Sequence, residues 1–244
     1  MMAKAPRRFL SLIALTAGVA TTAPAFAAST GVFYCGQTFR GTGILMNNLD
    51  CSGFGGSGVT IERGRLDLNG FSITNASQYG VVCLTTCQVT GPGTISGHGL
   101  DGVRTQGWIG LRDLIISNNI LNGVNARNTS RSSRVTIADS RVTNNGFNGI
   151  EADASVVLRR TVVRENGEQG VDVGLQNCDS TGRVLLFRSN VLANGAICSE
   201  SPVCGDLYSC GRNERSPVLR SFSQCGKSYV RGSSGATWGV CSQD

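Results

Sequence analysis

The sequence has one histidine, His98, and few aromatic residues, which make up 6% of its 244 residues. A Ser-His-Asp triad could therefore use only His98, and no surrounding pattern supports one. Clusters of Lys and Arg interleaved with aromatic residues are absent, which opposes nucleic-acid binding. A GxGxxG loop between a strand and a helix, a Walker loop and a haem motif are also missing, so no small soluble cofactor is indicated.

Long apolar runs are missing except near the N-terminus, at residues 9–19. This run is followed by small residues and the triplet AFA at 25–27, and is preceded by three positive charges, on Lys4, Arg7 and Arg8. The pattern is typical of a signal peptide covering residues 1–27. The run is too short to span a bilayer comfortably and no later stretch replaces it, so no membrane span is predicted. We expect a periplasmic or extracellular protein.

Cysteine is missing from residues 88–177, although ten cysteines lie elsewhere, all after residue 27. Tight CxxC pairs are absent and the single histidine is remote from most cysteines, which opposes a zinc site. An even number of cysteines in an exported chain indicates disulfides. The pairing is not readable from the sequence, but Cys35–Cys51 and Cys83–Cys87 are plausible local pairs. We expect each end of the chain to be stapled separately.

Helical patterning is scarce, whereas 33 glycines and an internal repeat are present. Four segments align without gaps, at 95–103, 116–124, 142–150 and 163–171. Their glycines recur at spacings of 21, 26 and 21 residues, and each is followed by Val or Ile. A repeat of this length cannot bury its apolar side alone and buries it by stacking on the next coil. The repeat therefore predicts a solenoid of about five or six coils.

The aligned repeats predict which residues stack inside the solenoid. The apolar columns are Leu111/Ile137/Leu158, Ile116/Val142/Val163 and Val103/Val124/Ile150/Val171. Equivalent residues of parallel strands lie about 4.8 Å apart. Three asparagines, Asn119, Asn145 and Asn166, form a polar column, and His98 aligns with them as its first rung.

Several of these segments resemble a known superfamily. The asparagine column, LDLNGFSI at 66–73 and GPGTISG at 91–97 resemble coils of right-handed parallel β-helices of the pectin-lyase-like superfamily. The start, CGQTF to LDCSG at 35–53, is similar to the capping segment of bacterial β-helix repeat proteins. The resemblance implies an all-β, right-handed parallel β-helix with disulfide-rich ends. We expect a β-helix with its N-terminal cap over 28–198 and an irregular, cysteine-rich C-terminal cap over 199–244.

His98 also invites a catalytic interpretation, because SGHG at 96–99 resembles the short histidine motif of polygalacturonases. The paired aspartate motifs that precede this histidine in that family, and the Arg-Ile-Lys motif that follows it, are absent here. A motif without its context is weak. We therefore expect His98 to have a structural role in the turn.

Alternation along the strands after each aligned glycine predicts one polar outer face. It carries Arg104, Gln106, Asn125, Arg127, Glu151, Asp153 and Asp172. Glu151 and Asp172 would lie about 5 Å apart, so they need a cation between them or a shared proton. Calcium would suit their oxygen atoms.

The same face can be interpreted in three ways. The resemblance to polyuronate lyases implies calcium at Glu151 and Asp172, with Arg104 or Arg127 neutralising a uronate and taking its proton. Close carboxylates, including Asp153, could instead serve glycoside hydrolysis. In both cases Gln106 and Asn125 are expected to bind substrate. Alternatively, the charges only keep the outer surface soluble.

A second charged column and two tryptophans complete the candidates. Asp113, Asp139 and Arg160 share a column near Arg112, Arg141 and Arg159, and mixed signs one coil apart indicate stabilising pairs between strands. Trp108 and Trp238 could each stack on a sugar ring, although a lone tryptophan is more commonly a packing residue.

Charge and shape together favour a polysaccharide as partner. Removal of the signal peptide lowers the formal charge from +6 to +3, which fits an acidic polymer without requiring one. We predict an exported protein that binds or processes an extracellular polysaccharide, as a lyase or a hydrolase if it is an enzyme. The alternative is a non-catalytic structural or adhesion protein, secreted or associated with the cell envelope, favoured by the small size and the scarcity of long insertions. The substrate and the oligomeric state are not indicated.

Overall fold

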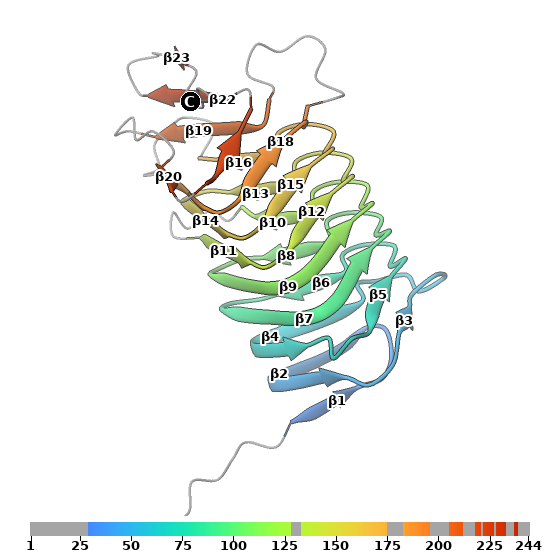
Figure 1. Ribbon diagram of the computed structural model, residues 1–244. Helices are drawn as coiled ribbons and strands as arrows, with labels where there is room; N and C mark the ends of the chain where they lie inside the picture. Colours follow the sequence, from blue (N-terminus) through green and yellow to red (C-terminus); the bar gives the residue numbers. More distant parts are fainter. Residues whose placement is uncertain are drawn as a thin grey trace, which may run out of the picture.

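The chain forms a parallel β-solenoid, in which strands are stacked from β1 at one end to β22 near the other (Figure 1). The computed structural model describes residues 29–127, 133–174, 183–195, 205–211, 218–220, 222–226, 228–232 and 237–238. The predicted signal peptide lies outside these residues. Within the described part of the chain, no helix is long and apolar enough to cross a membrane.

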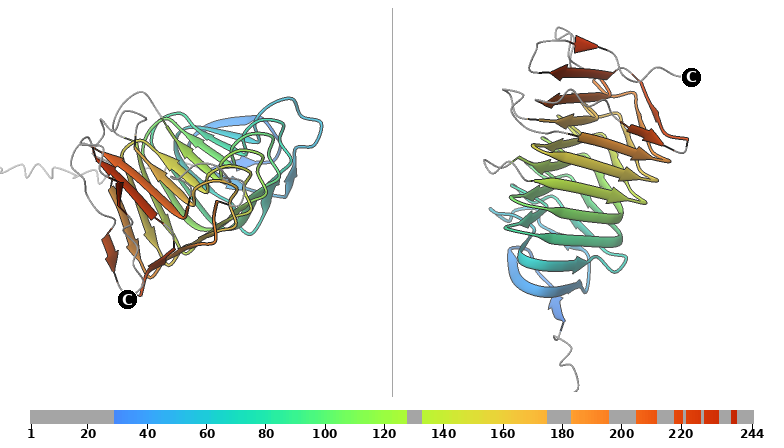
Figure 2. Two further views of the ribbon diagram at one scale, coloured as in Figure 1. Left: turned by 90° about the horizontal axis from the view of Figure 1, so that it is seen from above. Right: turned by 90° about the vertical axis from the view of Figure 1, so that its left-hand side faces the viewer.

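Each coil passes through three parallel sheets, and Figure 2 shows the coils stacked along one axis. Sheet 1 contains β1 (Thr30–Val32), β2 (Gln37–Leu45), β4 (Val59–Asp67), β7 (Cys87–Ser96), β9 (Ile109–Ser117), β11 (Arg134–Ala138), β14 (Ser155–Arg159), β17 (Arg183–Phe187) and β20 (Val218–Arg220). Sheet 2 contains β3 (Leu49–Asp50), β5 (Ser72–Thr74), β12 (Arg141–Thr143), β15 (Val162–Arg164), β18 (Asn190–Leu192) and β21 (Gln224–Cys225). Sheet 3 contains β6 (Val81–Cys83), β8 (Val103–Thr105), β10 (Val124–Ala126), β13 (Ile150–Ala152), β16 (Val171–Val173), β19 (Leu207–Gly211) and β22 (Ser228–Gly232).

Long strands turn the corners between the sheets. The first residues of β2 and β4 lie in sheet 3 and their later residues in sheet 1. The ends of β7 and β9 lie in sheet 2, where they pair with β5 and β12. The three sheets therefore enclose one continuous core.

The core confirms the predicted apolar columns. Ile137 pairs with Leu111 on one side and with Leu158 on the other, and all three side chains are buried. The columns through Ile116 and Val124 pair in the predicted register too. Branched side chains fit this position because each packs on its copies one coil away while strand pairing satisfies the backbone.

The asparagine ladder is confirmed and extends beyond the predicted residues. Each side-chain amide donates to the next residue, from Asn119 to Asn145 at 2.8 Å and from Asn145 to Asn166 at 2.9 Å. Asn166 continues to Asn194, which donates to a carboxylate oxygen of Asp206, both at 2.8 Å. All these groups are buried or partly buried, so the ladder fixes the register of the coils.

His98 forms the predicted first rung of this ladder. Its backbone N–H donates to Asn119 Oδ1 at 3.2 Å, and its ring Nδ1 accepts from the Ala76 N–H at 3.0 Å. Nε2 lies 3.1 Å from the Ile73 carbonyl oxygen, so it carries the ring proton. The ring is fully buried, and this burial lowers the pKa of His98 to about 4. The structural interpretation of SGHG fits these contacts.

The N-terminal disulfides are those predicted, Cys35–Cys51 and Cys83–Cys87. At the other end Cys225 is also in a disulfide.

Parallel pairing continues past residue 198, where the sequence predicted that the repeat ends. β19 pairs with β16, β20 with β17, β21 with β18 and β22 with β19. These strands pair through their backbones without the side chains of the repeat, as parallel stacking allows. The predicted boundary between the β-helix and the C-terminal cap stays a prediction. β23 (Thr237–Trp238) pairs antiparallel with β22.

Candidate functional site

The structure contains two candidate surfaces, and the first is the polar face predicted on sheet 3. Its register is the predicted one: Arg104 pairs with Asn125, Asn125 with Glu151 and Glu151 with Asp172. Tyr208 of β19 follows Asp172 in the same column. We call the group formed by Arg127, Glu151 and Asp172 the carboxyl pair with its arginine.

Arg127 supplies a cation to this pair. Its Nε lies 3.0 Å from Glu151 Oε1 and its Nη2 lies 3.4 Å from Asp172 Oδ2. Calcium takes six to eight oxygen ligands, whereas here a guanidinium lies beside both carboxylates. No group of three or more acidic, histidine or cysteine residues among the described ones could hold a metal ion. The contacts of Arg127 give a calcium ion at the pair no support, and a calcium site there stays a prediction.

The pair is less exposed than an outer face implies. Glu151 and Asp172 are each 9% exposed, although both side chains point away from the core. Burial raises the pKa of Glu151, and Arg127 partly offsets the rise. Burial also raises the pKa of Asp172 to about 7, against the opposing charge of Arg127.

The two carboxyl groups differ in their hydrogen bonds. Glu151 Oε2 accepts from Asn122 Nδ2 at 3.2 Å, whereas the buried Asp172 Oδ1 has no hydrogen-bond partner among the described residues. A donor stabilises the charged form and its absence disfavours it. Burial and the missing donor at Oδ1 both disfavour the charged form of Asp172, in line with its raised pKa.

A second polar ladder beside the pair was missed in the sequence. Asn122 donates through its side chain to Asp101 Oδ1 at 2.9 Å, and its own Oδ1 accepts from the Asn148 N–H at 3.0 Å. Asn148 Oδ1 in turn accepts from the Gln169 N–H at 3.0 Å. The signal was available, because these residues occupy the column directly before the aligned glycines.

The remaining predicted site residues lie around the pair, and the charges of Arg104 and Asp153 act on Glu151. Arg104 binds Asp101 at 3.4 Å, one ladder away from the pair. Asn125 is buried and its Oδ1 accepts from the Arg127 N–H at 3.0 Å, and its role in substrate binding stays a prediction. Asp153 is buried and Gln106 is exposed.

The second surface is a groove on the outside of sheet 1, which sequence analysis did not identify. It has a volume of about 490 Å³ and crosses β4, β7, β9 and β11, so it runs along the solenoid axis. Its polar and aromatic lining is formed by Arg65, Gln88, Thr90, Trp108, Arg112 and Asp113. We call it the arginine groove.

The groove presents its cations to solvent. The side chain of Arg65 is 48% exposed and that of Arg112 is 69% exposed. Arg65 Nη2 donates to Thr90 Oγ1 at 3.0 Å and lies 3.3 Å from Asp67. A β-carbon at Gly110 would lie 3.4 Å from the Trp108 ring, so the indole lies close above this glycine.

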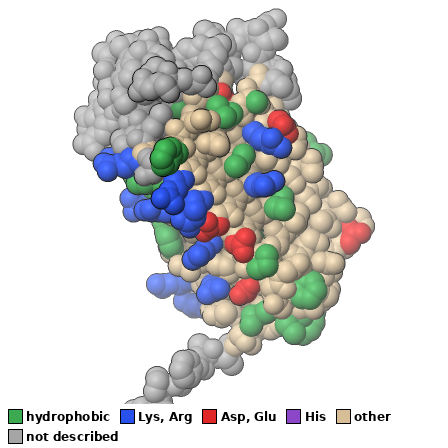
Figure 3. All heavy atoms as spheres, in the orientation of Figure 1, with side chains coloured by type: hydrophobic (Ala, Val, Ile, Leu, Met, Phe, Trp, Pro, Cys, Tyr) green, Lys and Arg blue, Asp and Glu red, His purple; other side chains and the backbone are tan. Residues whose placement is uncertain are grey.

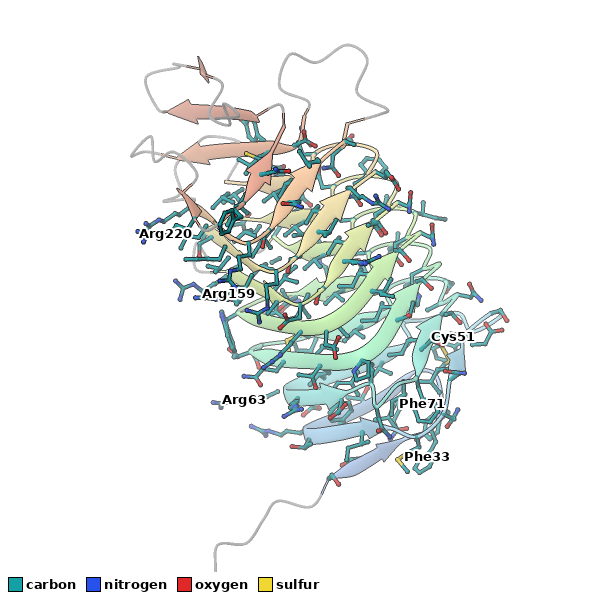
Figure 4. All side chains as sticks on the ribbon, in the orientation of Figure 1. Phe33, Cys51, Arg63, Phe71, Arg159 and Arg220 are labelled. Atoms are coloured by element: carbon teal, nitrogen blue, oxygen red, sulfur yellow. A yellow bond between two sulfur atoms is a disulfide. The ribbon has the colours of Figure 1, made fainter. Side chains whose placement is uncertain are left out.

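The positive charge continues beyond the groove. A second hollow of about 530 Å³ contains Arg40 and Arg63, with Glu62 as its acidic residue. Figure 3 shows Lys and Arg side chains gathered along one side of the solenoid, and Figure 4 shows Arg63, Arg159 and Arg220 projecting there. The sequence identified Arg112 and Arg159 but not the strip as a whole, because Arg40, Arg63 and Arg65 come from earlier coils outside the aligned repeats.

The predicted mixed-sign column at the edge of this strip is present. Asp139 accepts from Arg160 Nη2 at 2.8 Å and lies 3.5 Å from Arg112. The hydrogen bond from Arg160 lowers the pKa of Asp139. These contacts are the stabilising cross-coil pairs expected from the sequence.

Comparisons with known proteins assign no activity to this chain. No family model matches the sequence, and no curated protein matches it. Among solved structures, the crystal structure of pectate lyase Pel9A matches with 16% sequence identity and a TM-score of 0.45. The match covers 81% of this chain and 52% of that chain, so this chain spans about half the length of Pel9A.

Proposed function

We propose that this protein binds an acidic polysaccharide in the arginine groove. The observation that carries the proposal is that Trp108 lines an open groove together with two exposed arginines, Arg65 and Arg112. Guanidinium groups bind carboxylates and sulfates in a bidentate manner. An indole offers an apolar face for a sugar ring. A ligand that combines both features is a polymer of acidic sugars.

The direction of the groove supports a linear polymer. Arg65 lies in β4 and Arg112 in β9, two coils further along the axis. The rise between them is about 10 Å, twice the strand spacing. Gln88 and Thr90 of β7 lie between the two arginines, where they could hydrogen-bond sugar hydroxyls.

The carboxyl pair with its arginine supports a second candidate function, glycoside hydrolysis. Asp172, with its pKa near 7, has the protonation that a general acid needs, while Arg127 lies beside Glu151 and partly offsets the rise in the pKa of Glu151 that burial causes. This arrangement favours hydrolysis over β-elimination, because an arginine bound to two carboxylates does not readily lose its proton. Both carboxyl groups lie on sheet 3, away from the arginine groove, so binding and hydrolysis are separate proposals.

The test begins with the exported, oxidised protein and a panel of polyuronates and neutral glycans. We expect calorimetry to detect binding of a polyuronate, weakened about tenfold by Trp108→Ala and lost at high salt. Glu62→Gln, outside the groove, is the matched control and should bind as the parent does. Equal affinity for neutral glycans would contradict the proposal that the groove recognises an acidic polymer.

Turnover is followed in the same samples. New reducing ends that disappear in Asp172→Asn and Glu151→Gln, with both variants folded, would support hydrolysis at the pair. Unsaturated product that requires calcium would instead support a lyase. Binding without any product would favour a non-catalytic envelope or adhesion protein. If the protein neither binds nor converts any glycan, the structural role is the remaining hypothesis.

A further inference from the structure

The outer surface of the C-terminal half of sheet 1 carries an apolar strip that is buried at Val157 and partly exposed at Leu185 and Phe187. Val157 of β14 pairs with Leu185 of β17, and both side chains point away from the core. Phe187, two residues further along β17, is partly exposed in the next column. Three neighbouring outward positions on sheet 1 are therefore apolar. Contiguous apolar patches on a surface commonly mark binding sites.

Arginines surround this strip. They are Arg134, Arg159, Arg183, Arg188 and Arg220. The guanidinium carbon of Arg159 lies 4.5 Å from the centroid of the Phe187 ring, and Arg220 pairs with Phe187 on the next coil. Figure 4 shows Arg159 and Arg220 projecting from the same side. None of the described residues of β11, β14, β17 and β20 is acidic, so the charged side chains of these four strands are all positive.

Phe222 adds an exposed aromatic ring to the same end. It is 93% exposed, more than any other large apolar side chain described. Its φ of 62° places it in the left-handed region, as does the φ of 48° at Arg188, which occupies the corresponding turn one coil earlier. A bulky residue with positive φ is rare, and nothing in the core requires a phenylalanine at this turn.

We propose that this patch, an apolar strip ringed by arginines with Phe222 at its end, docks the protein on an anionic lipid bilayer. Guanidinium groups bind lipid phosphates in a bidentate manner. Apolar and aromatic side chains enter the boundary between headgroups and acyl chains. An acidic glycan would satisfy the arginines equally well and could stack on one ring, but it would not bury the aliphatic part of the strip together with Phe222. The combination of the strip and the 93% exposed ring therefore favours the lipid surface. The proposal is independent of glycan binding in the arginine groove.

The test is sedimentation of the oxidised full-length protein with vesicles. We expect it to pellet with vesicles of phosphatidylcholine and phosphatidylglycerol, but not of phosphatidylcholine alone, and to be released at high salt. The double variant Arg188→Ser/Arg220→Ser should partition about 30-fold more weakly, since each arginine at such a surface contributes roughly a fivefold effect. Phe222→Asn keeps a residue that tolerates positive φ and should weaken partitioning about tenfold.

Matched controls come from the other end of the solenoid. Arg40→Ser/Arg63→Ser removes two arginines of the same face, and Phe33→Ser removes a ring that is 55% exposed. Both should pellet as the parent does, and thermal melts should show that all variants are folded. Equal partitioning onto neutral vesicles would overturn the proposal. So would an equal loss in the control variants, or normal partitioning of Phe222→Asn, which would indicate a surface that binds any polyanion.

Discussion

The charged side chains on the outer faces of sheet 1 and sheet 3 differ in how far they are exposed to solvent. On sheet 1, Arg65 and Arg112 leave about half or more of their side chains in water. On sheet 3, Glu151 and Asp172 are 9% exposed and lie beside Arg127. Charges in water contribute little to stability and remain available to ligands. Buried charges depend on one another, and removal of one leaves the rest without compensation. The solenoid thus separates a surface suited to binding from a network suited to proton storage.

The largest expected effect is the loss of the arginine beside the buried pair. Arg127→Met at pH 8 should lower the free energy of unfolding by about 3–5 kcal/mol, because two buried carboxylates lose their counter-charge. Urea unfolding followed by circular dichroism measures the change. A loss below about 1 kcal/mol is the range for exposed ion pairs. It would show that the charges on sheet 3 are as well solvated as those on sheet 1, which would contradict the proposed difference between the two faces.

The next effect is a dependence of stability on pH. In the folded state the pKa of Asp172 is raised to about 7, from 3.8 in the unfolded chain. Between these values the folded protein holds a proton that the unfolded chain releases, so stability is greatest below pH 3.8 for this group and falls as pH rises through 7. The fall should be about 2–4 kcal/mol, since each pKa unit corresponds to roughly 1.4 kcal/mol.

Asp172→Asn separates this group from other titrating residues. The amide has the same shape and no charge, so the variant should lose most of the decline between pH 5 and 8 and should be more stable than the parent at pH 8. The measurement is a series of urea titrations across that range. An unchanged pH profile would mean that Asp172 ionises normally and is hydrated.

His98 should give the opposite slope and so serves as an internal comparison. Its folded pKa is lowered to about 4, from 6.5. Stability from this group is complete above pH 6.5 and is lost as pH falls toward 4, because a protonated ring cannot accept the Ala76 N–H. His98→Asn, which continues the ladder chemistry of Asn119, should flatten the acid side of the profile. If acid sensitivity persists in the variant, another group causes it.

The sequence predicted the fold well because the fold repeats. Each interior residue has copies one coil away, so a column such as Leu111/Ile137/Leu158 is visible as an alignment. The same property predicted that Glu151 and Asp172 are neighbours. Alternation assigns a side chain to the inside or the outside of a strand, but not its exposure. The burial of the pair and its contact with Arg127 depend on three-dimensional packing, which one strand's pattern does not contain.

The arginine groove was harder to predict for a related reason. Trp108 precedes β9 and Arg65 lies two coils earlier, in a coil whose sequence departs from the aligned repeat. Their proximity depends on the corner between sheets 3 and 1, where β4 turns. By contrast, the ladder at Asp101, Asn122 and Asn148 was readable, because its residues occupy one column of the alignment.

The smallest expected effect on stability belongs to the residue that we expect to matter for binding. Arg112 is 69% exposed and lies 3.5 Å from Asp139, which also pairs with Arg160. Arg112→Met should therefore change the free energy of unfolding by less than about 0.5 kcal/mol. It should nevertheless weaken polyuronate binding about tenfold, and the remaining binding should depend less on salt because one contact between ions is gone. Calorimetry at two salt concentrations measures both. If Arg112→Met lowered stability but kept its affinity for polyuronate, Arg112 would belong with the charges that stabilise the fold. Sheet 1 and sheet 3 would then differ only in the burial of their charged side chains.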